Sequence, residues 1–293
     1  MRFLPDSKFD VPARAAEIEA ILARAAGRPG GALFEHETYE LLEAAGIGTP
    51  AWFFHASGDD ADEIEDGLPH AGPFVAKAVI AGTTHKTEVN GLAFNVTSDK
   101  AADCAARFEE KFKGKGLMGV LFAEQIAHDR DLAGEMLVGL YQDPFFGPCV
   151  ALGFGGTSAE HYKRIMLPHA AQVYIPAAVD FASVDHILKN IPVVELLEGR
   201  VRGTSHQLSY EEISRAIGVL ASLGRYYSPA NPEAPFVIEE LEVNPAVASE
   251  GRVMALDGVA VVRKNDRTAP AAKPLGKIMK LLSPKSVAIA GAS

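Results

Sequence analysis

An acidic residue and an amide near the end of the chain are residue types that bind divalent cations. The segment 241–245 reads Leu-Glu-Val-Asn-Pro, and because side chains alternate along a strand, Glu242 and Asn244 share one face. Asp257 follows at a spacing that fits a neighbouring hairpin strand. Oxygen ligands of this kind suit Mg²⁺, which takes one or two protein groups together with phosphate oxygens and water. The alternative is a turn that begins at Asn244 and a solvated Asp257.

A lysine interrupts an otherwise apolar strand. The run 73–80 reads Pro-Phe-Val-Ala-Lys-Ala-Val-Ile and predicts a buried strand with Lys77 in its middle. An unpaired buried ammonium is costly, so we expect Lys77 to reach a partner or a ligand anion. The alternative is an edge strand from which the lysine extends into solvent.

A polar loop follows this strand. Residues 82–91 read Gly-Thr-Thr-His-Lys-Thr-Glu-Val-Asn-Gly, and the glycine at each end predicts a mobile loop that could lie over phosphate groups. His85 is the titratable group at its centre. An ordinary surface His-Lys pair is the alternative.

Two further segments could contact a nucleotide. Residues 124–127 (Glu-Gln-Ile-Ala) end a predicted strand at the junction of two lobes, which is a common location for a planar base beside apolar walls. Residues 153–157 (Gly-Phe-Gly-Gly-Thr) contain glycines that let backbone amides approach an anion. By itself a glycine cluster of this kind is also typical of a simple turn.

Several common catalytic motifs are absent from the sequence. It has no P-loop, no Gly-x-Ser-x-Gly nucleophile elbow and no His-Glu-x-x-His helix. A P-loop nucleotide site, a serine-hydrolase site and a zinc-protease site are therefore not expected.

The elements that must position these residues follow from apolar periodicity. Helices are predicted at about 11–26, 34–45, 98–111, 183–188, 193–197 and 210–226, and strands at 51–55, 73–80, 92–96, 120–125, 135–142, 149–154, 236–243 and 252–262. The strands between residues 120 and 154 leave no room for crossover helices, so we expect them to pair in antiparallel fashion. This pattern predicts a mixed α+β architecture in two lobes.

Composition limits the class of protein. The 293 residues are 48% hydrophobic and 23% charged with a net charge of −10, which predicts a globular protein and argues against a general binder of nucleic acid or anionic membranes. Cys104 and Cys149 are the only cysteines, so no disulfide framework is expected. The sequence has no apolar leader and no run of membrane-spanning length, and we expect a cytoplasmic location.

In this order, the motifs resemble the ATP-grasp domain of NDP-forming, that is ADP-forming, acyl-CoA synthetases, which are related to the succinyl-CoA synthetase β subunit. The resemblance covers about residues 32–262 and includes Tyr-Glu-Leu-Leu-Glu-Ala-Ala-Gly-Ile at 39–47 and Asp-Pro-x-Phe-Gly-Pro at 143–148. It implies a two-lobed ATP-grasp fold with mixed, largely antiparallel sheets. The implied segments are a helical extension (1–31), an N-terminal lobe (32–119), a C-terminal lobe (120–264), a linker (265–283) and the first strand of a truncated CoA-binding Rossmann-type domain (284–293).

The resemblance also implies residue roles. The residues that would bind ATP are Lys77 at the phosphates, the adenine hinge of Glu124, Gln125, Ile126 and Ala127, the further carboxylate Glu135, and Gly155 and Gly156. The implied Mg²⁺ ligands are Asn244 and Asp257. The implied catalytic residues are His85, which would relay a phosphoryl group, and Glu242, which would steady a phosphohistidine.

The implied reaction converts a carboxylate, CoA and ATP to acyl-CoA, ADP and phosphate through a phosphohistidine and an acyl phosphate. The partner is a pair of CoA-binding and CoA-ligase domains that carry the phosphorylated histidine and bind CoA, so this chain alone should be incomplete as a ligase. Two alternatives remain: an ATP-grasp carboxylate–amine ligase, and a degenerate nucleotide-sensing domain of a protein acetyltransferase. The acid, the choice of ATP or GTP and the oligomeric state stay open.

Overall fold

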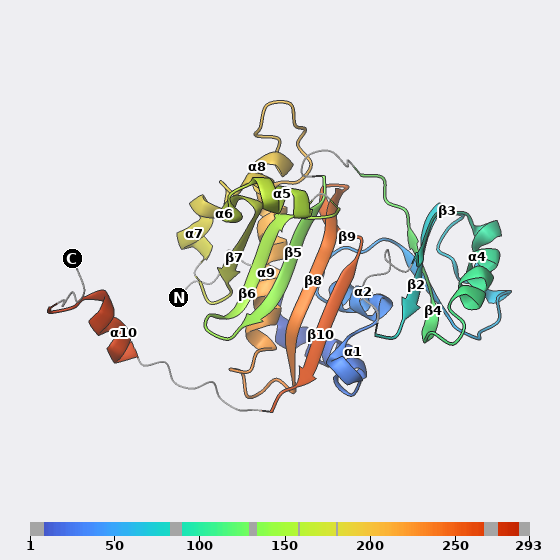
Figure 1. Cartoon of the computed structure of the whole chain (residues 1–293), viewed down its shortest axis with the longest axis horizontal. Coiled ribbons are helices and arrows are strands. Elements are labelled where there is room, and N and C mark those ends of the chain that lie inside the picture. The colour runs from blue at the N-terminus through green and yellow to red at the C-terminus, as the bar shows by residue number, and fades with distance from the viewer. Residues whose placement is uncertain are drawn as a thin grey trace, which may run out of the picture.

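The strands of the chain form two antiparallel sheets that lie beside one another (Figure 1). This computed structural model describes residues 9–82, 90–128, 134–157, 159–179, 181–266 and 275–286. The smaller sheet has the strand order β1-β4-β2-β3, and the larger has the order β10-β8-β5-β6-β7 with β9 paired to β8. The predicted antiparallel pairing between residues 120 and 154 is confirmed for β5 and β6, which form an antiparallel hairpin. It is wrong for β4, which lies in the smaller sheet and pairs with β1 and β2.

The smaller sheet is covered by helices on one face only. Its strands are β1 (Trp52–Ala56), β2 (Phe74–Ile80), β3 (Leu92–Val96) and β4 (Leu117–Glu124), and its helices are α3 (Glu63–Gly67) and α4 (Ser98–Lys111). Phe74, Ala76 and Ala78 of β2 pack with Phe108 of α4 in one core. Val79 belongs to the core of the larger sheet, so the alternation along β2 places Lys77 on the face that is turned towards that sheet.

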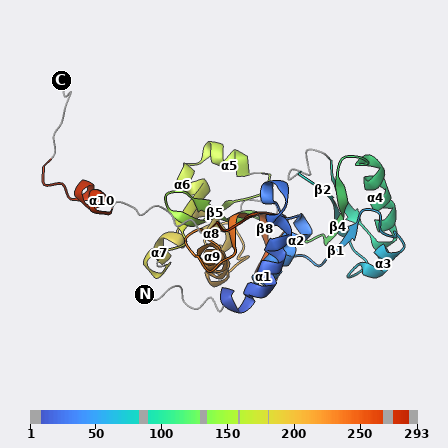
Figure 2. The same cartoon turned by 90° about the horizontal axis from the view of Figure 1, so that it is seen from below.

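Helix α9 (Tyr210–Tyr226) covers one face of the larger sheet. The strands are β5 (Met136–Asp143), β6 (Gly147–Phe154), β7 (Gln172–Pro176), β8 (Phe236–Ser249), β9 (Arg252–Ala255) and β10 (Gly258–Lys264). A Cβ on Gly224 of α9 would lie 2.4 Å from Leu140, so this glycine lets the helix approach β5 closely. On the other face, α5 (Ala159–Ile165) and α6 (Pro168–Ala171) lie opposite α9 and α1 (Figure 2).

The first two helices pack with the larger sheet, although they precede the smaller one in sequence. Helices α1 (Val11–Ala26) and α2 (Glu35–Ala44) contact one another and β10, and the short 3-10 turn Pro29–Gly31 joins them. Strand β4 pairs along its length with β2. A lobe boundary between residues 119 and 120 would therefore divide a strand of the smaller sheet, and the segment before β1 lies with the larger sheet. These long-range pairings correct the predicted lobe limits.

Other elements differ locally from the sequence expectation. The single strand predicted at 252–262 is two strands, β9 and β10, separated by a turn at Leu256 and Asp257. Helices α5 and α6 and strand β7 were not predicted. Helices α7 (Phe181–Leu188) and α8 (Pro192–Leu197) match expectation, whereas α10 (Leu275–Leu282) lies inside the predicted linker. Among the described residues, none of the helices is both long enough and apolar enough to cross a bilayer.

A buried carboxylate joins α9 to β9, the strand that leads to Asp257. Glu212 accepts hydrogen bonds from the Arg215 guanidinium at 2.7 and 2.8 Å and from the backbone N–H of Val253 at 3.0 Å. Burial alone would raise the pKa of Glu212, but the Arg215 and Val253 hydrogen bonds lower it below its ordinary value of 4.5. The ionised carboxylate therefore stabilises this contact.

We predict that Glu212→Gln lowers the melting temperature at pH 7, and that the difference from wild type shrinks as the pH falls below about 4.5. A carboxyl with a lowered folded-state pKa contributes its stability above the unfolded-state value and loses it as the pH falls through the folded-state value. Thermal unfolding at pH 7, 4.5 and 3 measures this. The control is the exposed neighbour Glu211→Gln, and an equal deficit for Glu212→Gln at all three pH values would contradict the prediction.

Candidate functional site

Lys77 lies at the junction of the two sheets and is 6% exposed. Its Nζ donates to Glu35 Oε1 at 2.5 Å, to the Tyr39 hydroxyl at 3.0 Å and to the Leu256 carbonyl at 2.5 Å. Glu35 and Tyr39 belong to α2, and Leu256 belongs to the turn between β9 and β10. The lysine therefore reaches buried partners, as expected, and the edge-strand alternative is wrong because β2 has neighbours on both sides.

The turn that contacts Lys77 also carries Asp257. The Leu256 carbonyl accepts from the Tyr39 hydroxyl at 2.6 Å as well as from Lys77. The backbone N–H of Asn244 donates to the Asp257 carbonyl at 3.1 Å, and Asp257 Oδ1 accepts from the Gly258 N–H at 2.8 Å. Asn244 and Asp257 are thus brought together as the spacing indicated, although Asp257 lies in a turn and not on a hairpin strand.

A hydrogen-bond network extends from Asn244 across the open face of the larger sheet. Its Oδ1 accepts from the Gly156 N–H at 2.9 Å, and its Nδ2 donates to Glu242 Oε1 at 3.2 Å. The second oxygen of Glu242 accepts from the Tyr141 hydroxyl. Both carboxylate oxygens of Glu242 therefore have a fixed donor, which orients the group.

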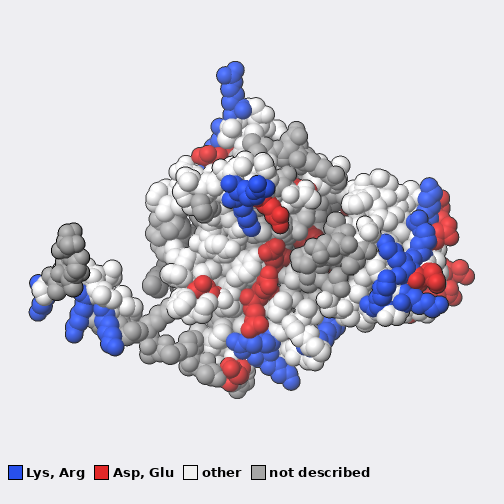
Figure 3. Space-filling view, viewed as in Figure 1, with Lys and Arg blue, Asp and Glu red and all other residues white. Residues whose placement is uncertain are grey.

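The electrostatics of this face keep Tyr141 protonated. Burial raises the pKa of the Tyr141 hydroxyl, and its hydrogen bond to Glu242 raises it further. Burial and the charge of Glu242 also raise the pKa of Glu240, which lies two residues before Glu242 on β8. Acidic atoms form a line over β8 on the face shown in Figure 3.

The glycine pair after β6 packs directly on the start of β5. The Gly155 N–H donates to the Glu135 carbonyl at 2.9 Å, and a Cβ on Gly155 would lie 2.3 Å from the Met136 backbone. A Cβ on Gly156 would lie 1.6 Å from Glu135 Oε2. Both amides therefore bond within the protein, and the glycines serve here to permit close approach, whereas the sequence suggested amides turned towards an anion.

Glu135 and the predicted hinge lie at the connection between the two sheets. Glu135 Oε1 is 3.2 Å from His128 Nε2, and His128 Nδ1 is 3.1 Å from the Ile126 carbonyl. The Gln125 side chain bonds Asn95 of β3 in both directions, at 2.8 and 3.0 Å. Glu124 is the last residue of β4, and Ala127, the last residue of the hinge, is exposed.

The structure adds residues that the sequence analysis did not select. Glu35 and Glu37 of α2 are 4% and 3% exposed. Tyr39 accepts a hydrogen bond from Lys77, and Tyr141 donates one to Glu242. The sequence feature that could have selected Glu35 is its position four residues before Tyr39, which places both residues on one helix face. His85, the predicted relay, lies outside the described residues, as does the segment 287–293.

The oxygen atoms near the β9–β10 turn suit a hard cation. Asn244 of β8 and Asp257 of the adjacent turn offer amide and carboxylate oxygens, which is the donor set that Mg²⁺ takes together with phosphate. Within the described part of the chain, no group of three or more His, Cys, Asp or Glu side chains could hold a metal ion. The two oxygen ligands Asn244 and Asp257 fit a metal that would be held jointly with a phosphate ligand.

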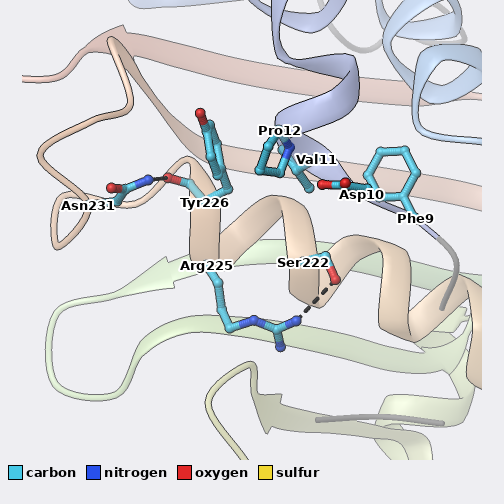
Figure 4. Close-up of a pocket in the computed structure, with 8 residues that line it drawn as sticks. All are labelled: Phe9, Asp10, Val11, Pro12, Ser222, Arg225, Tyr226 and Asn231. Atoms are coloured by element: carbon cyan, nitrogen blue, oxygen red, sulfur yellow. Dashed lines mark hydrogen bonds between the residues drawn. The ribbon is translucent and has the colours of Figure 1, made fainter. Parts of the chain in front are cut away.

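A pocket of about 360 Å³ lies elsewhere, between α9 and the start of α1 (Figure 4). Phe9, Arg225 and Asn231 contribute to its lining. Arg225 donates to the Ala177 carbonyl and to Ser222, and burial lowers its pKa. None of the residues selected from the sequence lines this pocket, so it is separate from the site described above.

Sequence comparison identifies a family. Residues 23–262 match the family described as the ATP-grasp domain. A trans-feruloyl-CoA synthase from an unknown prokaryotic organism is 30% identical over 242 residues, which cover 80% of this chain and 31% of the relative. The beta subunit of ADP-forming acetate-CoA ligase I from Pyrococcus furiosus is 26% identical over 240 residues, which cover 80% of this chain and 92% of the subunit. The chain thus spans about a third of the first relative.

Solved structures share the fold. The dinucleotide-forming acetyl-coenzyme A synthetase 1 of Ca. Korarchaeum cryptofilum, in complex with coenzyme A and Ca-AMPCP, has a TM-score of 0.66 at 23% identity and covers 85% of this chain and 100% of its own. PH1788 from Pyrococcus horikoshii has a TM-score of 0.66 at 19% identity and covers 87% of this chain and 99% of its own. At these identities the likeness supports the two-lobed fold expected from the sequence.

We predict that Gly155→Ala destabilises the chain by about 2 kcal/mol or more, because the added methyl overlaps the rigid backbone of β5. Gly27→Ala is the control, since a Cβ there meets nothing within 4 Å and φ is −99°. Its cost should stay within about 0.5 kcal/mol. Denaturant unfolding measures both, and equal midpoints for the two variants would contradict the packing argument.

Proposed function

Because the chain belongs to the ATP-grasp domain family, we propose that it is the nucleotide-binding, phosphoryl-transferring module of an ADP-forming acyl-CoA synthetase. The whole enzyme converts a carboxylate, CoA and ATP to acyl-CoA, ADP and phosphate. The relatives named as ADP-forming CoA ligases support this activity over the carboxylate–amine ligase and the degenerate sensing domain.

One observation carries the assignment: a buried lysine of the smaller sheet contacts the turn that holds Asp257, and Asn244 bonds the same turn. A cation and two oxygen ligands therefore meet where the two sheets face one another. Phosphoryl transfer depends on positioning and charge neutralisation more than on a strong protein nucleophile. This arrangement supplies those requirements for a triphosphate.

Each residue has a role in this proposal. Lys77 neutralises phosphate oxygens, and residues 124–127 take the adenine beside Glu135. Asn244 and Asp257 hold Mg²⁺, which supplies further neutralisation of phosphate charge when it is bound. Tyr141 and Asn244 orient Glu242, whose carboxylate accepts a hydrogen bond from a histidine that carries the phosphoryl group.

The histidine acceptor belongs to partner domains. We place the CoA site and the phosphorylated histidine on CoA-binding and CoA-ligase domains, in the same polypeptide or in a separate subunit. The Pyrococcus relative is named as a beta subunit, which supports a separate subunit. His85 is proposed to relay the phosphoryl group between the two parts. The site is proposed to work in the cytoplasm on a small carboxylic acid.

We predict that Asp257→Ala and Lys77→Met each weaken binding of Mg·ATP at least about tenfold. Loss of one charge-assisted contact of about 1.5–3 kcal/mol gives a factor of that size. Titration calorimetry on the 293-residue chain measures the dissociation constants. Glu239→Gln is the matched control, because Glu239 lies on β8, the strand that carries Asn244, but is exposed and paired with Arg263. Wild-type affinity in both site variants would refute the proposed site.

A second prediction concerns His85. After incubation with Mg·ATP and the partner domains, the wild-type chain should carry an acid-labile phosphoryl group on His85, and His85→Asn should not. Intact-protein mass spectrometry at neutral and acidic pH detects the added mass. Transfer to the partner histidine at the wild-type rate in His85→Asn would exclude the relay.

A further inference from the structure

The ammonium of Lys77 has no donor left for a nucleotide. A lysine ammonium has three N–H donors and no acceptor, and each has a protein acceptor in this structure: Glu35, Tyr39 and Leu256. Only 8% of the Lys77 side chain is exposed. A phosphate group can therefore bind Lys77 only if it replaces one of these three acceptors.

Glu35 differs from the other two acceptors in charge. Its side chain is 1% exposed and lies 2.5 Å from Nζ, so the two charges form a buried ion pair between α2 and β2. Leu256 offers a neutral carbonyl. Burial raises the pKa of the Tyr39 hydroxyl, so Tyr39 is also neutral. Such a pair is strongly destabilised when one partner is removed, because the other charge is then left buried and uncompensated.

We propose that Glu35 is the counter-ion of Lys77 when no nucleotide is bound, and that the phosphate groups of the nucleotide compete with Glu35 for the ammonium. This inference rests on the proposed function of Lys77. Exchange of a carboxylate for a phosphate keeps the ammonium paired, whereas displacement of a neutral carbonyl would place two anions on one cation. The exchange leaves the buried Glu35 carboxylate without its cation, and this cost weakens nucleotide binding.

The contacts of the Leu256 carbonyl show which part of the site stays in place when a phosphate replaces Glu35. The Leu256 carbonyl is held by both Lys77 and the Tyr39 hydroxyl, and Asp257 is the next residue. If Glu35 is the acceptor that leaves, Lys77 stays bonded to the turn that carries Asp257. The lysine and the proposed metal ligand then keep their relative positions when the nucleotide binds.

The test is the affinity of Glu35→Gln for Mg·ATP. Removal of the competing charge should tighten binding about three- to tenfold in calorimetry on the full 293-residue chain, while the melting temperature falls because the buried pair is lost. Glu35→Asp retains the charge on a shorter side chain and should change affinity in the same direction by less.

Glu37→Gln is the matched control. Glu37 lies on the same helix, is 3% exposed and accepts from Arg28 at 2.5 and 2.7 Å. Its loss should lower stability and leave the affinity for Mg·ATP at the wild-type value. Weaker or unchanged binding in Glu35→Gln overturns the counter-ion role, whereas absence of binding in the wild type refutes the proposed function itself.

A second test uses the wild-type chain and therefore does not require any variant to fold. In a crystal structure with Mg²⁺ and a non-hydrolysable ATP analogue, Lys77 Nζ should contact a phosphate oxygen and lie more than 4 Å from both carboxylate oxygens of Glu35. A Glu35 contact that persists beside a bound phosphate overturns the exchange. An analogue bound without any contact to Lys77 refutes the role of this lysine.

Discussion

The buried ammonium of Lys77 constrains the region where the two sheets meet. A charge at 6% exposure must be compensated, and its acceptors come from α2 and from the β9–β10 turn, far away in sequence. Glu35 and Tyr39 lie on α2, which packs with the larger sheet. Compensation of the Lys77 charge on β2 therefore ties the smaller sheet to the larger one. The same contact fixes the Leu256 carbonyl and with it the position of Asp257.

The oxygen-rich face depends on backbone contacts at the other end of this turn. Asn244 joins the Asp257 carbonyl to the Gly156 amide, and Glu242 receives Asn244 and Tyr141 as donors. The side chains proposed to hold metal and to face the phosphohistidine are therefore oriented before any ligand arrives. Such preorganisation favours charge stabilisation during phosphoryl transfer, because little reorientation is needed.

Prediction from the sequence was wrong where the interacting residues lie far apart along the chain. The lobe limits were misplaced because β4 pairs with β2 across more than thirty residues, and local periodicity contains no information about such pairing. Glu35 was not selected because a carboxylate on a helix is usually exposed, and only the position of Lys77 makes its burial favourable. The glycines at 155 and 156 predicted free amides, whereas the Glu135 carbonyl and the Asn244 side chain accept hydrogen bonds from them.

The sequence by itself determined the elements and the chemistry available. Apolar periodicity determined helices such as α1, α4 and α9, the mid-strand position identified Lys77, and alternation placed Glu242 and Asn244 on one face. The tertiary structure alone decided which groups meet: Glu35 with Lys77, Tyr141 with Glu242, and Asn244 with the Gly156 amide. The physical reason is that periodicity depends on neighbouring residues along one element, whereas compensation of a buried charge depends on groups that only folding brings within hydrogen-bond distance.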